Sequence, residues 1–191
     1  EKYYRKIGIN INVDELIVTV AGSESVNLAL EIACDPGDEV LVLEPFYTNY
    51  NTFAFTNKLT LKAIATDIRN GFQIPPIEEF EKAITPKTKA ILICNPGNPT
   101  GTQYSKESML ALGEIARKHD LFLLSDEVYR EFCYTDEPHF SAMNIPGLEQ
   151  NVILIDSVSK RYNLCGARIG CIVSHNKDVM AAAMKFAQAR L

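Results

Sequence analysis

The sequence lacks the features that mark several large classes of protein. No apolar run approaches the length of a membrane span, and a formal net charge of −5 leaves no positive footprint for nucleic acid or an anionic membrane. No secretory signal follows Glu1, so we expect a cytoplasmic address. The first residues include no initiator methionine and read like the middle of a helix, so we expect the chain to be an excised piece.

Disulfide and metal-binding patterns are also missing. The five cysteines are scattered without a C-x-x-C pair, and the three histidines lie far apart without ligand spacing. Cys34, Cys94 and Cys171 fall in apolar helix or strand patterns, which favours buried, reduced thiols. We therefore expect no metal site.

What is present is an alternation of strand and helix patterns. The 191 residues are 47% hydrophobic and 23% charged, enough for one large domain but few for two. Strands that are apolar on both faces predict a mostly parallel sheet covered on each side, an α/β three-layer sandwich. The patterns predict strands at 16–20, 39–43, 59–65, 89–94, 121–124, 152–155 and 168–173, and helices at 24–34, 46–56, 75–83, 105–118 and 177–190.

Polar clusters follow four of the predicted strands. They are Gly22-Ser23-Glu24, 95–101 (NPGNPTG), 126–129 (DEVY) and 157–160 (SVSK). In open α/β sheets, ligands bind beyond the carboxyl ends of the strands, so we expect the clusters to meet at one edge. Taken alone, each has an ordinary interpretation as a helix entry, a rigid turn, a surface cap or a solvated lysine. Their joint occurrence in this order favours one ligand site.

The residue types at the last cluster indicate a particular ligand. A lysine that forms a Schiff base needs a sheltered pocket, and Lys160 follows a strand that reads as buried. Arg168 stands eight positions later between glycines, and small hydroxyl residues precede the lysine, a combination that suits a phosphate. An amine for an aldehyde beside a phosphate site indicates pyridoxal phosphate (PLP).

Nucleotide hydrolysis is a competing interpretation from another class. The segment 122–127 (FLLSDE) looks like the apolar strand ending in Asp-Glu that holds magnesium in P-loop NTPases. That interpretation requires G-x-x-x-x-G-K-[ST] upstream, and the chain has none.

Together these motifs resemble the class I/II aminotransferases, fold type I PLP enzymes, in their aspartate aminotransferase-like form. The loop 95–101, the segment 126–129, and 157–160 followed by 166–170 (GARIG) carry the resemblance, which spans nearly the whole chain. It implies that residues 1–191 are the large, cofactor-binding domain of a PLP-dependent transferase. It also implies that an N-terminal segment and a C-terminal small domain are absent.

The resemblance assigns roles at the reacting end of the cofactor. Lys160 matches the Schiff-base lysine, which also moves a proton between Cα of the substrate and C4′ of the cofactor. Asp126 matches the carboxylate that keeps the pyridine nitrogen protonated. Asn98 and Tyr129 match the pair that hydrogen-bonds the phenolic oxygen, and the asparagine also touches the substrate carboxylate.

It assigns the phosphate end in the same way. Ser23 and Glu24 correspond to a phosphate-binding turn that acts through backbone N–H groups. Ser157 and Arg168 match side-chain phosphate ligands, and Ser159 is a further candidate.

Two segments depend on weaker parts of the pattern. The segment 44–47 (EPFY) resembles the one that places an aromatic ring over the cofactor; we expect Tyr47 to supply that ring and to meet the substrate, with Phe46 in the core. The stretch 163–165 (NLC) is not the commonest family form. Cys165 would matter if it lay near the cofactor, but we expect it to serve packing.

The implied activity is transamination between an amino acid, aspartate or an aromatic one, and a 2-oxo acid. Alternatives are a carbon–sulfur lyase, an aminocyclopropane carboxylate synthase-like enzyme, or a PLP-sensing domain of a transcription regulator. The family also implies a homodimer in the full-length protein. We expect poor turnover by the chain alone, because the family's substrate-carboxylate arginine lies outside it.

Overall fold

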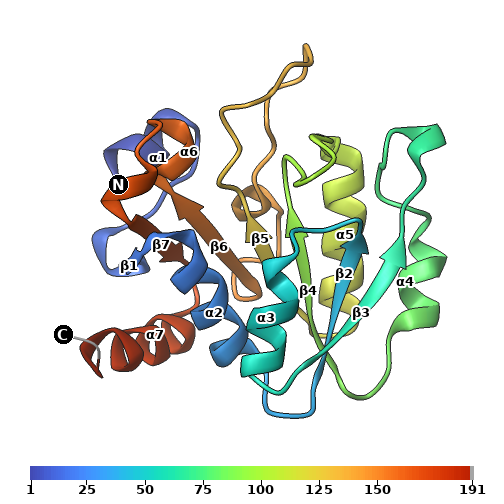
Figure 1. Ribbon diagram of the computed structural model, residues 1–191, viewed down its shortest axis with the longest axis horizontal. Coiled ribbons are helices and arrows are strands. Elements are labelled where there is room, and N and C mark those ends of the chain that lie inside the picture. Colours follow the sequence, from blue (N-terminus) through green and yellow to red (C-terminus); the bar gives the residue numbers. More distant parts are fainter. Residues whose placement is uncertain (190–191) are drawn as a thin grey trace.

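The computed structural model describes residues 1–189, which form one α/β unit around a seven-stranded sheet (Figure 1). The strands are β1 (Leu16–Val20), β2 (Glu39–Glu44), β3 (Thr60–Ala65), β4 (Thr88–Cys94), β5 (Phe122–Asp126), β6 (Val152–Ser157) and β7 (Ile169–Val173). The α-helices are α1 (Lys2–Lys6), α2 (Ala21–Ala33), α3 (Asn49–Thr56), α4 (Ile77–Ala83), α5 (Lys106–Lys118), α6 (Val158–Arg161) and α7 (Lys177–Ala189). Among these residues, no helix is both long and apolar enough to cross a membrane.

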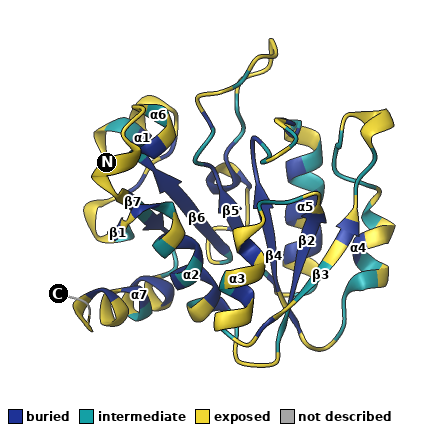
Figure 2. Cartoon of the chain, viewed as in Figure 1, coloured by how far each residue is buried: buried dark blue, intermediate teal, exposed yellow. Residues whose placement is uncertain are grey.

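Helices cover both faces of the sheet, as the apolar strands predicted. Successive strand residues point to opposite faces, so Leu41 joins the core beneath α4 and α5 while Val40 and Val42 join the core beneath α2, α3 and α7. The inner strands β4, β5 and β6 are accordingly almost fully buried between helices whose outer faces are exposed, whereas the edge strands β1 and β3 are partly exposed (Figure 2). The predicted three-layer sandwich is confirmed.

The sheet is mostly parallel, with one reversed strand. The strand order is β1-β7-β6-β5-β4-β2-β3, and β7 is antiparallel to both of its neighbours while β2 to β6 are parallel. The reversal follows from the short connection 158–168, which turns back at the end of β6. The amino end of β7 therefore lies at the same edge as the carboxyl ends of the other six strands.

The boundaries differ from the predicted ones mainly at this edge. The helix after β1 begins at Ala21, because Glu24 accepts a hydrogen bond from the Val20 N–H and closes the first turn. A short helix, α6, was not predicted at all, since four residues are too few for a periodic pattern. Elsewhere the predicted strands and helices are confirmed to within about three residues, and the predicted end of the last helix, at residue 190, lies outside the described residues. Of the three thiols expected to be buried, Cys94 is buried, and Cys34 and Cys171 are partly buried.

Candidate active site

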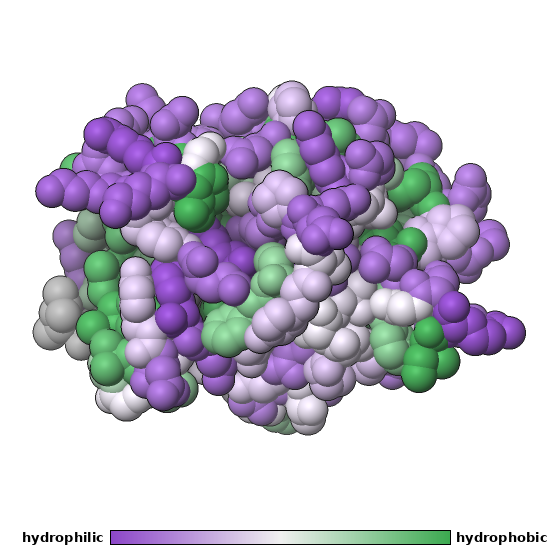
Figure 3. Space-filling model, turned by 90° about the horizontal axis from the view of Figure 1, so that it is seen from above, coloured by the Kyte–Doolittle hydropathy of each residue, from purple (hydrophilic) through white to green (hydrophobic). Residues whose placement is uncertain are grey.

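A cavity of about 300 Å³ opens at the carboxyl edge of the sheet. Seen from above this edge, a recess with mostly hydrophilic atoms lies near the middle of the face (Figure 3). Its lining includes all but one of the side chains predicted for the site, namely Ser23, Tyr47, Asn98, Asp126, Tyr129, Ser157, Ser159, Lys160 and Arg168. The polar clusters that follow separate strands thus meet in space.

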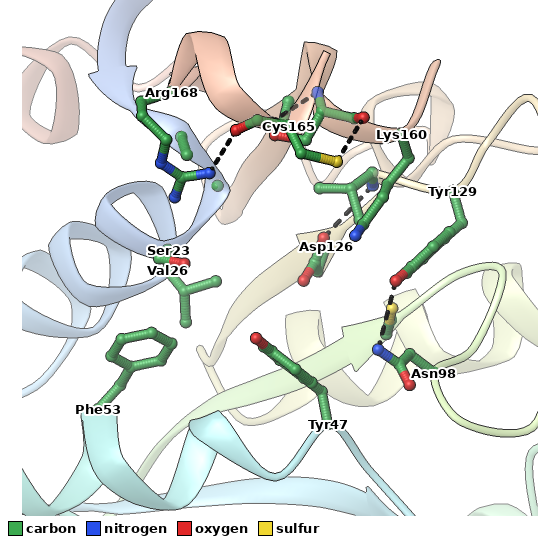
Figure 4. Close-up of a pocket in the computed structure, with 16 residues that line it drawn as sticks. Ser23, Val26, Tyr47, Phe53, Asn98, Asp126, Tyr129, Lys160, Cys165 and Arg168 are labelled. Carbon is green, nitrogen blue, oxygen red and sulfur yellow. Dashed lines mark hydrogen bonds between the residues drawn. The ribbon is translucent and has the colours of Figure 1, made fainter. Parts of the chain in front are cut away.

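Lys160 and Asp126 occupy the middle of the cavity (Figure 4). Asp126 is the last residue of β5, whereas Lys160 extends from α6 after β6. The Lys160 Nζ lies 5.8 Å from the centre of the Tyr129 ring. An amine and a carboxylate therefore face one space from two neighbouring strands.

Asp126 is an unusual carboxylate because it is buried. Burial raises its pKa from the ordinary 3.8 to about 6, and the nearby carboxylates of Asp156 and Glu127 also raise it. Hydrogen bonds act in the opposite direction: the Tyr50 hydroxyl donates to Oδ2 at 2.8 Å, and the Val128 N–H donates to Oδ1 at 3.3 Å. A buried carboxylate of this kind is stabilised by a cation placed against it.

The loop 95–101 brings an amide to the rim opposite the phosphate candidates. Its first residue is locked in place: the Asn95 N–H donates to the Asp126 carbonyl at 2.9 Å, and its Oδ1 accepts from the Tyr104 N–H at 3.0 Å. Further along the loop, the Asn98 Nδ2 donates to the Tyr129 hydroxyl at 3.4 Å. Burial raises the pKa of Tyr129, so its hydroxyl stays protonated and available as a donor.

The other end of the cavity is suited to an anion. The first turn of α2, at Gly22 and Ser23, presents N–H groups at the positive end of a helix dipole. The Ser157 hydroxyl lies 2.8 Å from that of Ser159, and both line the same wall. Arg168 extends over this end, where its Nη1 donates to the Cys165 carbonyl at 2.8 Å (Figure 4).

Close packing of backbone against backbone sets this end in place. A Cβ on Gly170 of β7 would lie 2.4 Å from the carbonyl carbon of Ala21, at the start of α2. Only glycine therefore lets β7 pass beneath the helix entry. Arg168, just before β7, has a φ of +53°, in the left-handed region that is uncommon for side-chain-bearing residues.

Glu24 is the one candidate that does not line the cavity. Its carboxylate turns back to the Val20 N–H at the start of α2. Its side chain therefore closes the helix entry, and only its backbone N–H belongs to the positive end of the dipole.

The aromatic segment 44–47 places one of its two rings at the cavity. Tyr47 lines the cavity, and its hydroxyl accepts a hydrogen bond from Asn49 at 2.7 Å. Phe46 instead packs against the core beneath α3, with its ring 6.3 Å from that of Tyr50.

Sequence reasoning left several contributors to the site unassigned, and three of them matter most for its shape and chemistry. The Tyr50 hydroxyl donates a hydrogen bond to Asp126, and Phe53, about one turn later on α3, lines the cavity. Their spacing from Tyr47, three and six residues, is the helical signal that would have placed them on one face. Cys165 was expected to serve packing, but it is exposed, lines the cavity, and its thiol donates to the Ser159 carbonyl at 3.2 Å.

Comparison with known proteins agrees with this arrangement. A family model described as aminotransferase class I and II matches residues 1–190. The chain belongs to this family. The aspartate/prephenate aminotransferase of Thermus thermophilus is 34% identical over 183 residues, which are 96% of this chain and 46% of that protein.

Solved structures of aminotransferases also share the fold. The aspartate aminotransferase of Thermotoga maritima has a TM-score of 0.91 and 30% identity, covering 99% of this chain and 50% of that one. The aromatic aminotransferase of Pyrococcus horikoshii has a TM-score of 0.92 and 26% identity, covering 98% of this chain and 50% of that one. The chain thus spans about half the length of the relatives it matches.

Proposed function

We propose that this chain is the PLP-binding large domain of an aminotransferase, which moves an amino group between an amino acid and a 2-oxo acid. The observation that carries the proposal is the convergence on one cavity of a lysine amine, a buried carboxylate and an anion-binding end. We further propose that residues 1–191 correspond to this domain alone, with an N-terminal segment and a C-terminal small domain outside it. The chain's length, about half that of its relatives, supports this division.

The residues present fit PLP at each of its functional groups. A protonated ring nitrogen would meet Asp126, whose buried carboxylate favours a cation. The phosphate would bind the N–H groups at the start of α2, with Ser23, Ser157, Ser159 and Arg168 around it.

Asn98 and Tyr129 would donate to the phenolic oxygen. Tyr47 would lie against the ring and, with Asn98, meet the substrate.

PLP, when bound, supplies an aldehyde that joins to amines and a ring that withdraws electrons from the neighbouring carbon. The chain's part is to hold and to move protons. Lys160 would hold the cofactor through its amine. Once the substrate's amine displaced it, the free Lys160 amine would take the proton from the substrate Cα and deliver it to C4′ of the cofactor. Asp126 would keep the ring nitrogen protonated, and the Tyr129 hydroxyl would stabilise the phenolic oxygen as an anion.

We propose aspartate or an aromatic amino acid as the donor. The names of the relatives support both, since they include aspartate/prephenate and aromatic aminotransferases. One solved neighbour, the aspartate aminotransferase of Thermus thermophilus, is described with maleate, a dicarboxylate. The arginine expected to bind the substrate α-carboxylate would lie outside this chain.

The first experiment tests the cofactor and the lysine together. The purified protein is incubated with PLP, freed of excess cofactor, and compared with Lys160→Ala and with Lys87→Ala, an exposed lysine at the other end of the sheet. We expect an absorption band in the visible or near ultraviolet that borohydride fixes onto the peptide containing Lys160. The Lys87 variant should keep both signals, and the Lys160 variant should lose both. A borohydride-fixed adduct that persists in Lys160→Ala would contradict the assignment.

The reaction itself is tested on the full-length protein. Aspartate and an aromatic amino acid are supplied separately with 2-oxoglutarate, and glutamate formation is measured. Release of ammonia or of a thiol from cystathionine, without amino-group transfer, would instead indicate a carbon–sulfur lyase.

We also propose a homodimer for the full-length protein, which the family resemblance implies, and a cytoplasmic location. Light scattering after size exclusion measures the first, and a single-protomer mass would contradict it. Cell fractionation measures the second.

A further inference from the structure

Four charged side chains are buried together behind the candidate site. Glu127, Arg130, Asp156 and Arg161 lie on the face of the sheet that α1 covers, with side chains no more than 8% exposed. Two carboxylates balance two guanidinium groups. Buried charges are costly unless they are paired, so removing any one of these four side chains would leave an unpaired buried charge.

Asp156 is the centre of the cluster. Its Oδ1 accepts the Ser157 N–H at 2.7 Å and the Arg161 Nη2 at 2.8 Å. Its Oδ2 accepts the same Nη2 at 2.7 Å and the Tyr4 hydroxyl at 2.7 Å. One carboxylate is thereby bonded to the residue that precedes α6 and to the residue that ends it.

Arg161 is held on a second side by an aromatic ring. Its guanidinium carbon lies 3.8 Å from the centre of the Tyr3 ring on α1, and its Nε lies 3.5 Å from the Glu131 carboxylate. A guanidinium fixed by two oxygens and a ring has little freedom to rotate.

The consequence concerns Lys160, the residue immediately before Arg161. The helix that carries both has four residues, too few to be stable without tertiary contacts. Successive residues of a helix point about 100° apart, so the two side chains leave α6 in different directions. Arg161 enters the buried cluster, whereas Lys160 enters the cavity.

We infer that Asp156 and Arg161 form a positioning pair: by fixing the rotation of α6 about its axis, they aim the Lys160 amine into the cavity. Neither residue lines the cavity, so both would act through α6. The inference rests on the proposed role of Lys160. The orientation of that amine can nevertheless be measured without cofactor, by its reactivity towards a labelling reagent.

The test compares Arg161→Gln and Arg161→Lys with Arg117→Gln, a control in which an exposed arginine on α5 loses its partner Glu114. The first readout is the rate at which PLP becomes fixed to Lys160, followed by borohydride quenching and peptide mass spectrometry. The second is made without cofactor: labelling of Lys160 by an amine-selective acylating reagent, relative to Lys87 in the same sample.

We expect Arg161→Gln to slow PLP attachment by roughly tenfold or more, as expected for a displaced reacting group, and to change the relative labelling of Lys160. Arg161→Lys should recover part of both, because it restores the charge but not the two-oxygen contact. The Arg117 variant should match the unmodified protein. Circular dichroism verifies folding, and Arg161→Lys, which keeps the buried charges balanced, provides the readouts if Arg161→Gln does not fold.

The two proposals fail in different ways. If PLP attaches normally to Lys160 in every Arg161 variant and labelling is unchanged, the pair only stabilises the fold and this inference is wrong. If the unmodified protein never fixes PLP but Lys160 labelling responds to Arg161, the positioning stands and the cofactor proposal falls.

Discussion

The Tyr50 hydroxyl donates a hydrogen bond of 2.8 Å to Asp126 Oδ2, and both residues are buried. Tyr50 lies in the first turn of α3 and Asp126 ends β5, so the bond joins a helix to the sheet that it covers. Of the contacts that lower the pKa of Asp126 against the effect of burial, this hydrogen bond has the largest effect. Burial raises the pKa of Tyr50 as well, so the tyrosine remains a donor.

Removing this bond should make Asp126 a weaker acid. In Tyr50→Phe, burial and the neighbouring carboxylates act with less opposition, so the pKa of Asp126 should rise further above about 6. We expect weaker PLP binding at pH 6.5 than in the unmodified protein, with recovery at pH 8.5, measured by absorbance titration. Tyr104→Phe, a buried tyrosine elsewhere in the core, should bind PLP normally at both pH values. An unchanged pH dependence in Tyr50→Phe would contradict this role.

The raised pKa of Asp126 also predicts how stability varies with pH. An acid whose pKa is about 6 when folded but near 3.8 when unfolded binds more protons in the folded state between those values. Its contribution to the free energy of unfolding is therefore greatest below about pH 4 and is lost as the pH rises through 6. In cofactor-free protein, the stability of Asp126→Asn relative to wild type should increase from pH 4.5 to pH 7.5, measured by urea unfolding. An equal difference at both values would refute the shift.

The close approach of Gly170 to Ala21 predicts a position-specific effect of one methyl group. Gly170→Ala places a Cβ within 2.4 Å of backbone, so either α2 or β7 must shift. We expect a loss of about 1–3 kcal/mol in the free energy of unfolding, and weaker binding of PLP because the anion-binding end is distorted. Gly166→Ala is the matched control, since a Cβ there meets nothing within 4 Å. Equal stabilities for the two variants would show that the approach is not tight.

Arg168 should distinguish a cofactor with a phosphate from one without. We expect Arg168→Gln to weaken PLP binding about 10- to 100-fold, the range for losing a hydrogen bond to a charged group, while pyridoxal binds as before. Arg69→Gln, which removes an exposed arginine near the end of β3, serves as the control. If pyridoxal binding falls as much as PLP binding, Arg168 does not act through the phosphate.

Local patterns in the sequence predicted the layers and most of the site. Strands such as β4 are continuous apolar runs, and polar residues such as Asp126 and Lys160 stand where runs end, so the edge that holds the cavity followed from chain order alone. The start of α5 was equally predictable: the helix predicted from residue 105 begins at Lys106, and Ser105 accepts a hydrogen bond from the Ser108 N–H at 3.1 Å.

What the sequence could not predict were contacts between residues far apart in the chain. The bond from Tyr4 to Asp156 joins residues 152 positions apart, and nothing periodic links them. The direction of β7 was equally hidden, since an apolar run reads the same both ways. Yet that direction is what brings Arg168 to the edge occupied by Lys160. Pairing partners, rather than element types, were the missing information.

The position of β7 in the sheet determines the order in which the strands can pair during folding. The first strand of the chain, β1, has β7 as its neighbour in the sheet, and Ile17 pairs with Ile172. During synthesis, β1 therefore cannot pair until β7 has been made. Contacts so distant in sequence form slowly. In refolding followed by pulsed hydrogen exchange, we expect amides of β4 and β5 to gain protection before those of β1 and β7; simultaneous protection would contradict this. A nascent chain would thus shape the Asp126 side of its cavity first and complete the anion-binding end last.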